Sequence, residues 1–173
     1  MISFLPASYG QKGKSEISAA YGYWSIYTFV NGKPFSNSSG TGMLNYKYYL
    51  TQRFTLGMVF GYENISNWGS FLTFAPEFSY TYLDTKDDRI RIKLYGSGSL
   101  GMTVFDDFFV YNDIFSHHKD ESGPKVTAHA SPFGMRIGRK LAGFVEIGLG
   151  YKGLINMGAS YRFRTHARVH TEN

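Results

Sequence analysis

The chain of 173 residues contains no cysteine, which excludes disulfides, thiolate metal sites and cysteine nucleophiles. No window approaches the roughly 20 consecutive apolar residues of a membrane-spanning helix. The formal net charge is +5, but no run of Lys and Arg stands out, so no nucleic-acid partner is indicated. No motif indicates a cofactor. The length is that of one domain with a substantial core.

Aromatic residues and glycine are abundant instead. The chain holds 14 Tyr, 15 Phe and 2 Trp, together 18 %, beside 20 Gly. Tyr and Phe favour strands and Gly disfavours helix interiors, so the composition indicates an all-β fold. Large apolar residues alternate with small or polar ones in eight segments: 15–24, 42–50, 53–63, 71–82, 89–102, 125–137, 143–151 and 155–163.

The links between these segments favour hairpins between sequence neighbours. Across 50–54, 137–141 and 151–155 the apolar residues return on the same face, as antiparallel pairing requires. The links after the second, fourth and sixth segments are short or modest. Those after the first, third and fifth include the longer ones, and only the last link breaks the rule. Short turns on one rim and long loops on the other are typical of an outer-membrane barrel with periplasmic termini.

Periodicity defines two faces but does not say which one is inside. A soluble, lipocalin-like barrel would enclose a ligand with the apolar face, whereas a membrane barrel turns that face to lipid. The polar face is also the small face, and an eight-stranded lumen is narrow. We therefore predict a closed, antiparallel, up-and-down, eight-stranded transmembrane β-barrel, with the soluble barrel as the alternative. The small residues of the polar face are Gly57, Gly61, Ser97, Ser99, Gly148, Gly150, Gly158 and Ser160.

Charged residues on the polar face predict a network that plugs the lumen, because buried charges must pair or reach water. The predicted members are Glu16, Lys47, Arg53, Glu63, Glu77, Arg89, Arg91, Lys93, Glu146, Lys152 and Arg162. Tyrosines near the segment ends, Tyr151 and Tyr161 among them, are predicted to face lipid as interfacial girdles.

The stretch "GFVEIGLGYKGLINMGASYRF", residues 143–163, resembles the final hairpin of small outer-membrane β-barrel proteins, especially the porin-family-like barrels common in Bacteroidetes. That resemblance implies a Gram-negative outer membrane, with lipid and lipopolysaccharide as surroundings. It also implies that the aromatic end of the last strand, Phe163, is read by the barrel assembly machinery. Residues 1–10 resemble the remnant of an export signal. We therefore expect the barrel domain at 11–163 and a polar periplasmic tail at 164–173.

His129 and Ser131 invite comparison with the lipid A deacylases, which are eight-stranded barrels with a membrane-facing His-x-Ser and a carboxylate. A serine nucleophile needs a base within hydrogen-bond reach, and the base needs an orienting group. His129 and Ser131 share the parity of Phe133 and are predicted to face lipid, whereas Glu146 is predicted to face the lumen. Unless a bulge near Pro132 changes the face, no triad assembles, and we expect no enzyme.

The link 104–124 combines acidic, histidine and aromatic residues. Its oxygen ligands could bind a divalent cation and its histidines zinc, but the spacing matches no established loop, and no metal site is predicted. Its aromatic strip favours contact with lipopolysaccharide or another outer-membrane protein. The acids and histidines are Asp106, Asp107, Asp113, His117, His118, Asp120 and Glu121; the aromatics are Phe105, Phe108, Phe109, Tyr111 and Phe115.

The function that these patterns favour is a structural, adhesion-type or accessory outer-membrane protein with a plugged lumen. A narrow porin-like channel is the second hypothesis, although the lumenal charges predict little or no flux. A lipid A-modifying enzyme of the deacylase type is the third.

Overall fold

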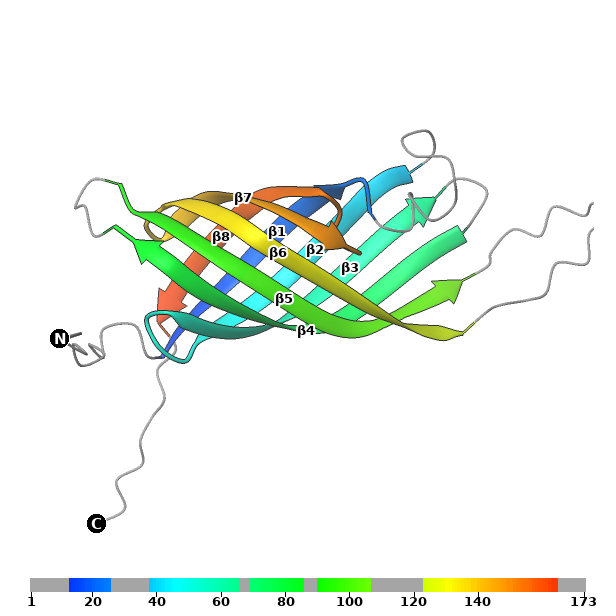
Figure 1. The fold of residues 1–173 in the computed structure, drawn as a ribbon, viewed down its shortest axis with the longest axis horizontal. Helices are drawn as coiled ribbons and strands as arrows, with labels where there is room; N and C mark the ends of the chain where they lie inside the picture. The colour runs from blue at the N-terminus through cyan, green and yellow to red at the C-terminus, as the bar shows by residue number, and fades with distance from the viewer. Residues whose placement is uncertain (1–12, 26–37, 66–68, 86–89, 107–122, 165–173) are drawn as a thin grey trace, which may run out of the picture.

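The computed structural model describes residues 13–25, 38–65, 69–85, 90–106 and 123–164. They form one closed barrel in which each strand pairs antiparallel with its sequence neighbours and β1 pairs with β8 (Figure 1). The predicted eight-stranded antiparallel barrel is confirmed. In the described part of the chain, no helix has the length and apolar character of a membrane span. The strands are β1 (Lys14–Tyr23), β2 (Ser38–Tyr49), β3 (Phe54–Ile65), β4 (Gly69–Asp84), β5 (Ile92–Asp106), β6 (Pro124–Gly138), β7 (Leu141–Gly150) and β8 (Ile155–Arg164).

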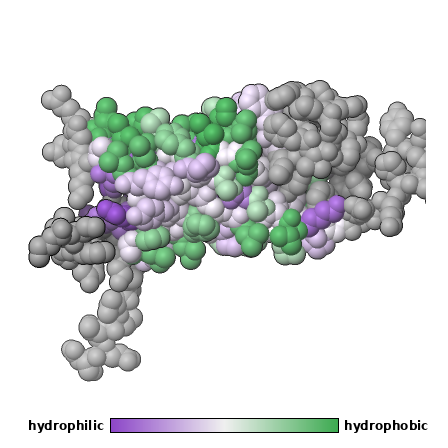
Figure 2. Space-filling model, viewed as in Figure 1, coloured by the Kyte–Doolittle hydropathy of each residue, from purple (hydrophilic) through white to green (hydrophobic). Residues whose placement is uncertain are grey.

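The apolar face of the barrel points outward. Leu44, Phe78 and Leu100 are each more than 60 % exposed, whereas the charged side chains between such positions are buried. Figure 2 shows apolar side chains distributed over the outside of the strands. A lipocalin-like barrel would need the opposite arrangement, so that alternative is wrong for this fold.

The two ends of the barrel differ in their connections. The links 50–53, 85–91 and 139–140 lie at one end, which is also where β1 begins and β8 ends (Figure 1). We call this the short-turn end. At the opposite, loop end the links are 24–37, 66–68, 107–123 and 151–154. The link 66–68 is shorter than expected because β3 and β4 pair as far as Ile65 and Gly69. Residues 1–10, 165–173 and most of 104–124 lie outside the described residues.

A β-bulge interrupts β6 at Pro132. On the β5 side Ser97 pairs with Ser131 and Tyr95 with Gly134, so Pro132 and Phe133 are skipped. On the β7 side Ala130 pairs with Leu149 and Phe133 with Ile147, so Ser131 and Pro132 are skipped. Proline cannot donate a ladder hydrogen bond and is found in inner strands mainly at bulges. The extra residue reverses the alternation, so Pro132 and Phe133 are both exposed while Ser131 is buried.

The turn between β7 and β8 folds inward at the loop end. Gly150 and Gly153 have φ of 136° and 94°, in the left-handed region that favours glycine. Between them Tyr151 and Lys152 are fully buried, and Tyr151 packs with Met43 of β2. The prediction that Tyr151 faces lipid is therefore wrong, because the turn inverts the alternation that holds along β7.

Candidate functional site

The lumen contains a group of two lysines and two glutamates, Lys47, Glu77, Glu146 and Lys152, which we call the lysine cluster. Lys47 Nζ lies 2.6 Å from Glu77 Oε1 and 3.8 Å from Glu146 Oε1. Lys152 Nζ bonds Glu77 Oε2 from the other side and lies 3.7 Å from Glu146 Oε2. All four side chains are buried, and their formal charges cancel. Such an arrangement compensates four charges that would be costly to bury singly.

Polar neighbours complete the shell of Glu146. The hydroxyl of Tyr95 donates to Glu146 Oε1 over 2.9 Å, and Asn156 Nδ2 donates to Oε2 over 3.0 Å. Glu146 therefore has its oxygens engaged by neutral donors as well as by ammonium groups. Hydrogen bonds to a buried carboxylate are among the stronger ones in proteins.

A second group, nearer the short-turn end, consists of Glu16, Tyr49, Arg136 and Arg162, and we call it the arginine cluster. Glu16 Oε2 accepts from Arg162 Nη2 over 2.8 Å and from the Tyr49 hydroxyl over 2.7 Å, and it lies 3.3 Å from Arg136 Nε. Arg162 also donates to the Tyr49 oxygen over 2.6 Å, and its guanidinium lies 4.6 Å from the centroid of that ring. Two guanidinium groups thus share one carboxylate.

The other predicted members of the lumenal network take different positions. Glu63 is buried toward the loop end, where Ser25 and Thr41 donate to its oxygens over 2.8 and 3.1 Å. Lys93 is buried beside the arginine cluster. Arg91 is half-buried at the short-turn rim, where its Nε donates to Asp84 over 2.6 Å.

Arg53 was predicted in the lumen and this is wrong. It belongs to the turn before β3, is exposed, and donates to the Tyr80 hydroxyl over 3.4 Å. The alternation of β3 does not extend into that turn. Arg89 lies outside the described residues.

Sequence reasoning missed three lumenal residues. Tyr49 and Tyr95 share the parity of Lys47 and Lys93, and that signal would have placed them inside. Arg136 shares the parity of Gly134 and Gly138 beyond the bulge. The lumen thus holds two large aromatic rings whose hydroxyls donate to carboxylates, Tyr49 to Glu16 and Tyr95 to Glu146.

His129 and Ser131 face the lumen, not lipid as predicted, because of the bulge at Pro132. Ser131 Oγ donates a hydrogen bond to the backbone carbonyl of Ile147 over 2.9 Å. The hydroxyl proton that a catalytic base would remove is therefore already engaged in that bond. Neither ring nitrogen of His129 has a hydrogen-bond partner among the described residues, and the ring lies 5.8 Å from that of Tyr151. No nucleophile–base contact is formed. No group of three metal-ligating side chains occurs among the described residues either.

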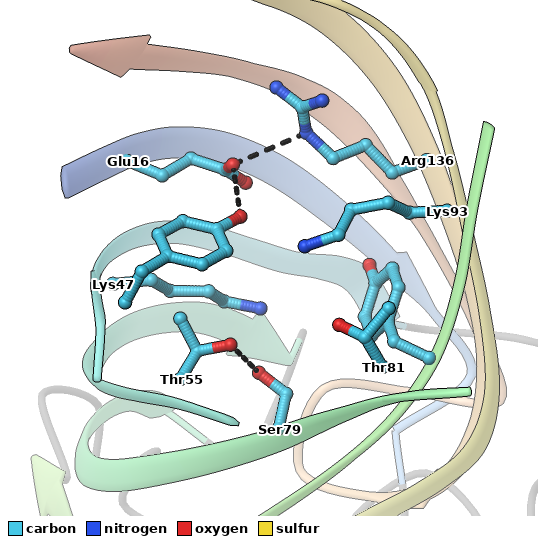
Figure 3. Close-up of a pocket in the computed structure, with 9 residues that line it drawn as sticks. Glu16, Lys47, Thr55, Ser79, Thr81, Lys93 and Arg136 are labelled. Carbon is cyan, nitrogen blue, oxygen red and sulfur yellow. Dashed lines mark hydrogen bonds and ion pairs between the residues drawn. The ribbon is translucent and has the colours of Figure 1, made fainter. Parts of the chain in front are cut away.

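A cavity of about 20 Å³ lies beside the arginine cluster (Figure 3). That volume accommodates about one water molecule. In Figure 3 the side chains of Glu16, Arg136 and Lys93 converge on this space from different strands. Its lining residues are Glu16, Lys47, Tyr49, Thr55, Ser79, Thr81, Lys93, Tyr95 and Arg136.

Comparison with known proteins gives the fold class. No family model and no curated protein matches the chain. The structure is similar to the N-terminal β-barrel domain of Pseudomonas aeruginosa OprF, with a TM-score of 0.55, 13 % identity, and coverage of 88 % of this chain and 98 % of that one. A chain from the de novo design of transmembrane β-barrels is also similar, with a TM-score of 0.46, 17 % identity, and coverage of 88 % and 97 %.

The likeness to the OprF domain, with the observed strand order and lumen, defines an eight-stranded barrel of the outer-membrane type. At 13 % identity it establishes the fold alone. The finer resemblance to Bacteroidetes barrels, drawn from residues 143–163, is not supported by these comparisons.

Proposed function

We propose that the chain is an integral outer-membrane protein of a Gram-negative bacterium, with a closed lumen and a structural, adhesion-type or accessory role. One observation carries the proposal: the barrel is apolar outside and charged inside. Leu44, Phe78 and Leu100 are largely exposed while Lys47, Glu77 and others are buried. In water this arrangement would expose a broad apolar surface, which a lipid bilayer would cover.

The aromatic residues on the outer face lie at two levels, one toward each end of the barrel. Near the short-turn end the rings of Phe54 and Tyr80 lie 4.9 Å apart, and near the loop end Tyr21 and Tyr23 lie 4.9 Å apart. On β3, the stretch from Phe54 to Tyr62 is about 26 Å long at 3.3 Å per residue. At a tilt of about 40° it rises about 20 Å along the barrel axis, close to the apolar band of outer-membrane barrels.

The short-turn end, where β1 begins and β8 ends, is proposed to be periplasmic, because outer-membrane barrels have short periplasmic turns. Fractionation tests the proposed location. The protein is expected in the membrane fraction after washing with urea or carbonate, and detergent is expected to extract it. Recovery of folded protein from cells without detergent would overturn the proposal.

The closed lumen is supported by the lysine cluster and by the small size of the cavity beside the arginine cluster. The protein reconstituted in planar bilayers is expected to show no stepwise conductance. Reproducible single-channel steps would favour the narrow channel instead, while leaving the membrane location intact.

A non-enzymatic role is proposed because Ser131 Oγ donates to a backbone carbonyl and the His129 ring does not reach it. Wild-type protein and the Ser131→Ala variant are both expected to leave lipid A acylation unchanged. Loss of an acyl chain with wild-type protein but not with the variant would establish the enzyme.

Two partners are proposed from the sequence. The link 104–124 is proposed to contact lipopolysaccharide or another outer-membrane protein, and its residues 107–121 can be deleted without removing β5 or β6. The deletion is expected to abolish co-purification of that component, and unchanged co-purification would oppose the contact.

Phe163 is proposed as the assembly signal. Phe163→Ala is expected to lower assembly in cells but not refolding in vitro, and equal assembly would oppose it.

A further inference from the structure

A buried lysine that forms no ion pair with a described residue faces the cavity at the short-turn end (Figure 3). Lys93 is only 3 % exposed, yet its ammonium makes no hydrogen bond or ion pair with any described residue. The ammonium instead lies over the ring of Tyr49, with Nζ 4.6 Å from the ring centroid. Cation–π contact offsets part of the cost of burying a charge, but an ammonium group still has three protons to donate.

The carboxylates on that side of the barrel are already engaged. Glu16, which lines the same cavity, is shared by Arg162 at 2.8 Å and Arg136 at 3.3 Å. Asp84 stands directly across the β4–β5 register from the lysine, but both its oxygens are bonded by the guanidinium of Arg91. Neither Glu16 nor Asp84 therefore forms an ion pair with the Lys93 ammonium.

The charge count around the cavity is positive. Lys47 also lines the cavity, but its charge is matched within the lysine cluster. The rest of the site has two carboxylates, on Glu16 and Asp84, against four bases, which are Arg91, Arg136, Arg162 and Lys93. Three hydroxyl groups line the same space, on Thr55, Ser79 and Thr81. Ser79 donates its proton to Thr55 Oγ1 over 3.3 Å, which leaves the hydroxyl protons of Thr55 and Thr81 to donate to an anion.

We propose that this cavity is a binding site for a monatomic anion of the chloride type, held by the ammonium of Lys93 and neighbouring hydroxyl groups. The positive surroundings select an anion, because a buried charge is stabilised by an opposite charge at short range. The volume of about 20 Å³ selects a small one. A space that accommodates about one water molecule does not admit a five-atom oxyanion such as phosphate or sulfate.

The site is tested by thermal unfolding of the full chain in detergent, in sodium chloride and in sodium gluconate at equal concentration. A ligand that binds the folded state at ten times its Kd is expected to raise the Tm of a chain this size by about 3–6 °C. The wild type is expected to be more stable in chloride by such a margin, and Lys93→Met is expected to lose the difference. Arg53→Met, which removes an exposed base outside the lumen, is the matched control and is expected to keep it.

Equal Tm values of the wild type in the two salts would overturn the proposal, and so would a difference that Lys93→Met retains. Bromide provides a readout that needs no variant. Crystals of the wild-type protein grown in bromide are expected to show an anomalous peak at the Lys93 ammonium. Absence of a peak there would overturn the proposal even if Lys93→Met failed to fold.

Discussion

Glu77 offers the sharpest test of the lumenal network. Its side chain is buried, and its two oxygens bind the ammonium groups of Lys47 and Lys152. Replacing it by glutamine changes the shape little but leaves two buried ammonium groups with one carboxylate, Glu146, at 3.8 and 3.7 Å. Removing one partner of a buried ion pair costs about 3–5 kcal/mol, and we expect Glu77→Gln to lie in this range.

A second substitution isolates the electrostatic part of this cost. Lys152→Met alone leaves two carboxylates with one lysine, whereas the double variant Glu77→Gln/Lys152→Met leaves Lys47 with Glu146 and is neutral again. The double variant is therefore expected to cost at least about 2 kcal/mol less than the sum of the single variants. If the variants only removed hydrogen bonds and the charges were not coupled, the costs of the two single variants would add up to that of the double variant.

The assay is urea unfolding of the refolded protein in phospholipid vesicles, followed by tryptophan fluorescence under conditions where refolding is reversible. Arg53→Gln, which removes an exposed charge, is the control and is expected to change the free energy of unfolding by less than about 0.5 kcal/mol. A cost below about 1 kcal/mol for Glu77→Gln, with additive single variants, would refute the reasoning. It would mean that water solvates the lumenal lysines.

Two further predictions concern the outer face and the strand packing. Leu44 is exposed halfway along its strand, so Leu44→Arg is expected to cost about 2–4 kcal/mol in vesicles, while Leu141→Arg at the short-turn end costs about 0–1 kcal/mol. Equal costs in urea unfolding would contradict the proposed membrane position. A Cβ at Gly57 would lie 2.4 Å from the Tyr46 carbonyl oxygen, whereas one at Gly143 meets its nearest atom at 4.0 Å. Gly57→Ala is therefore expected to cost about 1–3 kcal/mol and Gly143→Ala under about 0.5 kcal/mol, and the reverse order in the same assay would contradict the packing.

The strands and their outward face could be predicted from sequence because a period of two residues is a local property. The alternation in 53–63 needs no knowledge of the rest of the chain to place Phe60 and Tyr62 on one face and Gly61 and Glu63 on the other, and the structure has them so. Errors arise where alternation is interrupted. One extra residue at Pro132 moves His129 and Ser131 from the outside to the lumen. Proline in an inner strand is the available signal for that bulge.

Turns are the second limit. Extending the alternation of β7 through residues 151–155 predicts the correct side for Ile155 but the wrong side for Tyr151. The reason is that the turn between Gly150 and Gly153, both with positive φ, folds into the barrel. The prediction for Arg53 is wrong for a related reason. Arg53 lies in the turn before β3, and the alternation of a strand does not determine the side of a turn residue. Alternation predicts a side only for residues whose backbone is extended on both sides.

Which charged side chains pair within the lumen depends on the register of several strands. A glycine on the strand between two charged residues also determines whether they can reach each other. Lys47 lies beside Gly57 in the β2–β3 register, and Gly57 lies beside Glu77 in the β3–β4 register. Because Gly57 has no side chain, Lys47 can cross β3 and place its ammonium 2.6 Å from Glu77. A Cβ at Gly57 would stand 3.1 Å from Lys47 Cγ, in the path of that side chain. The small residues that mark the inner face in the sequence thus do more than fit a narrow lumen, because at this position one provides the gap through which charges two strands apart can meet.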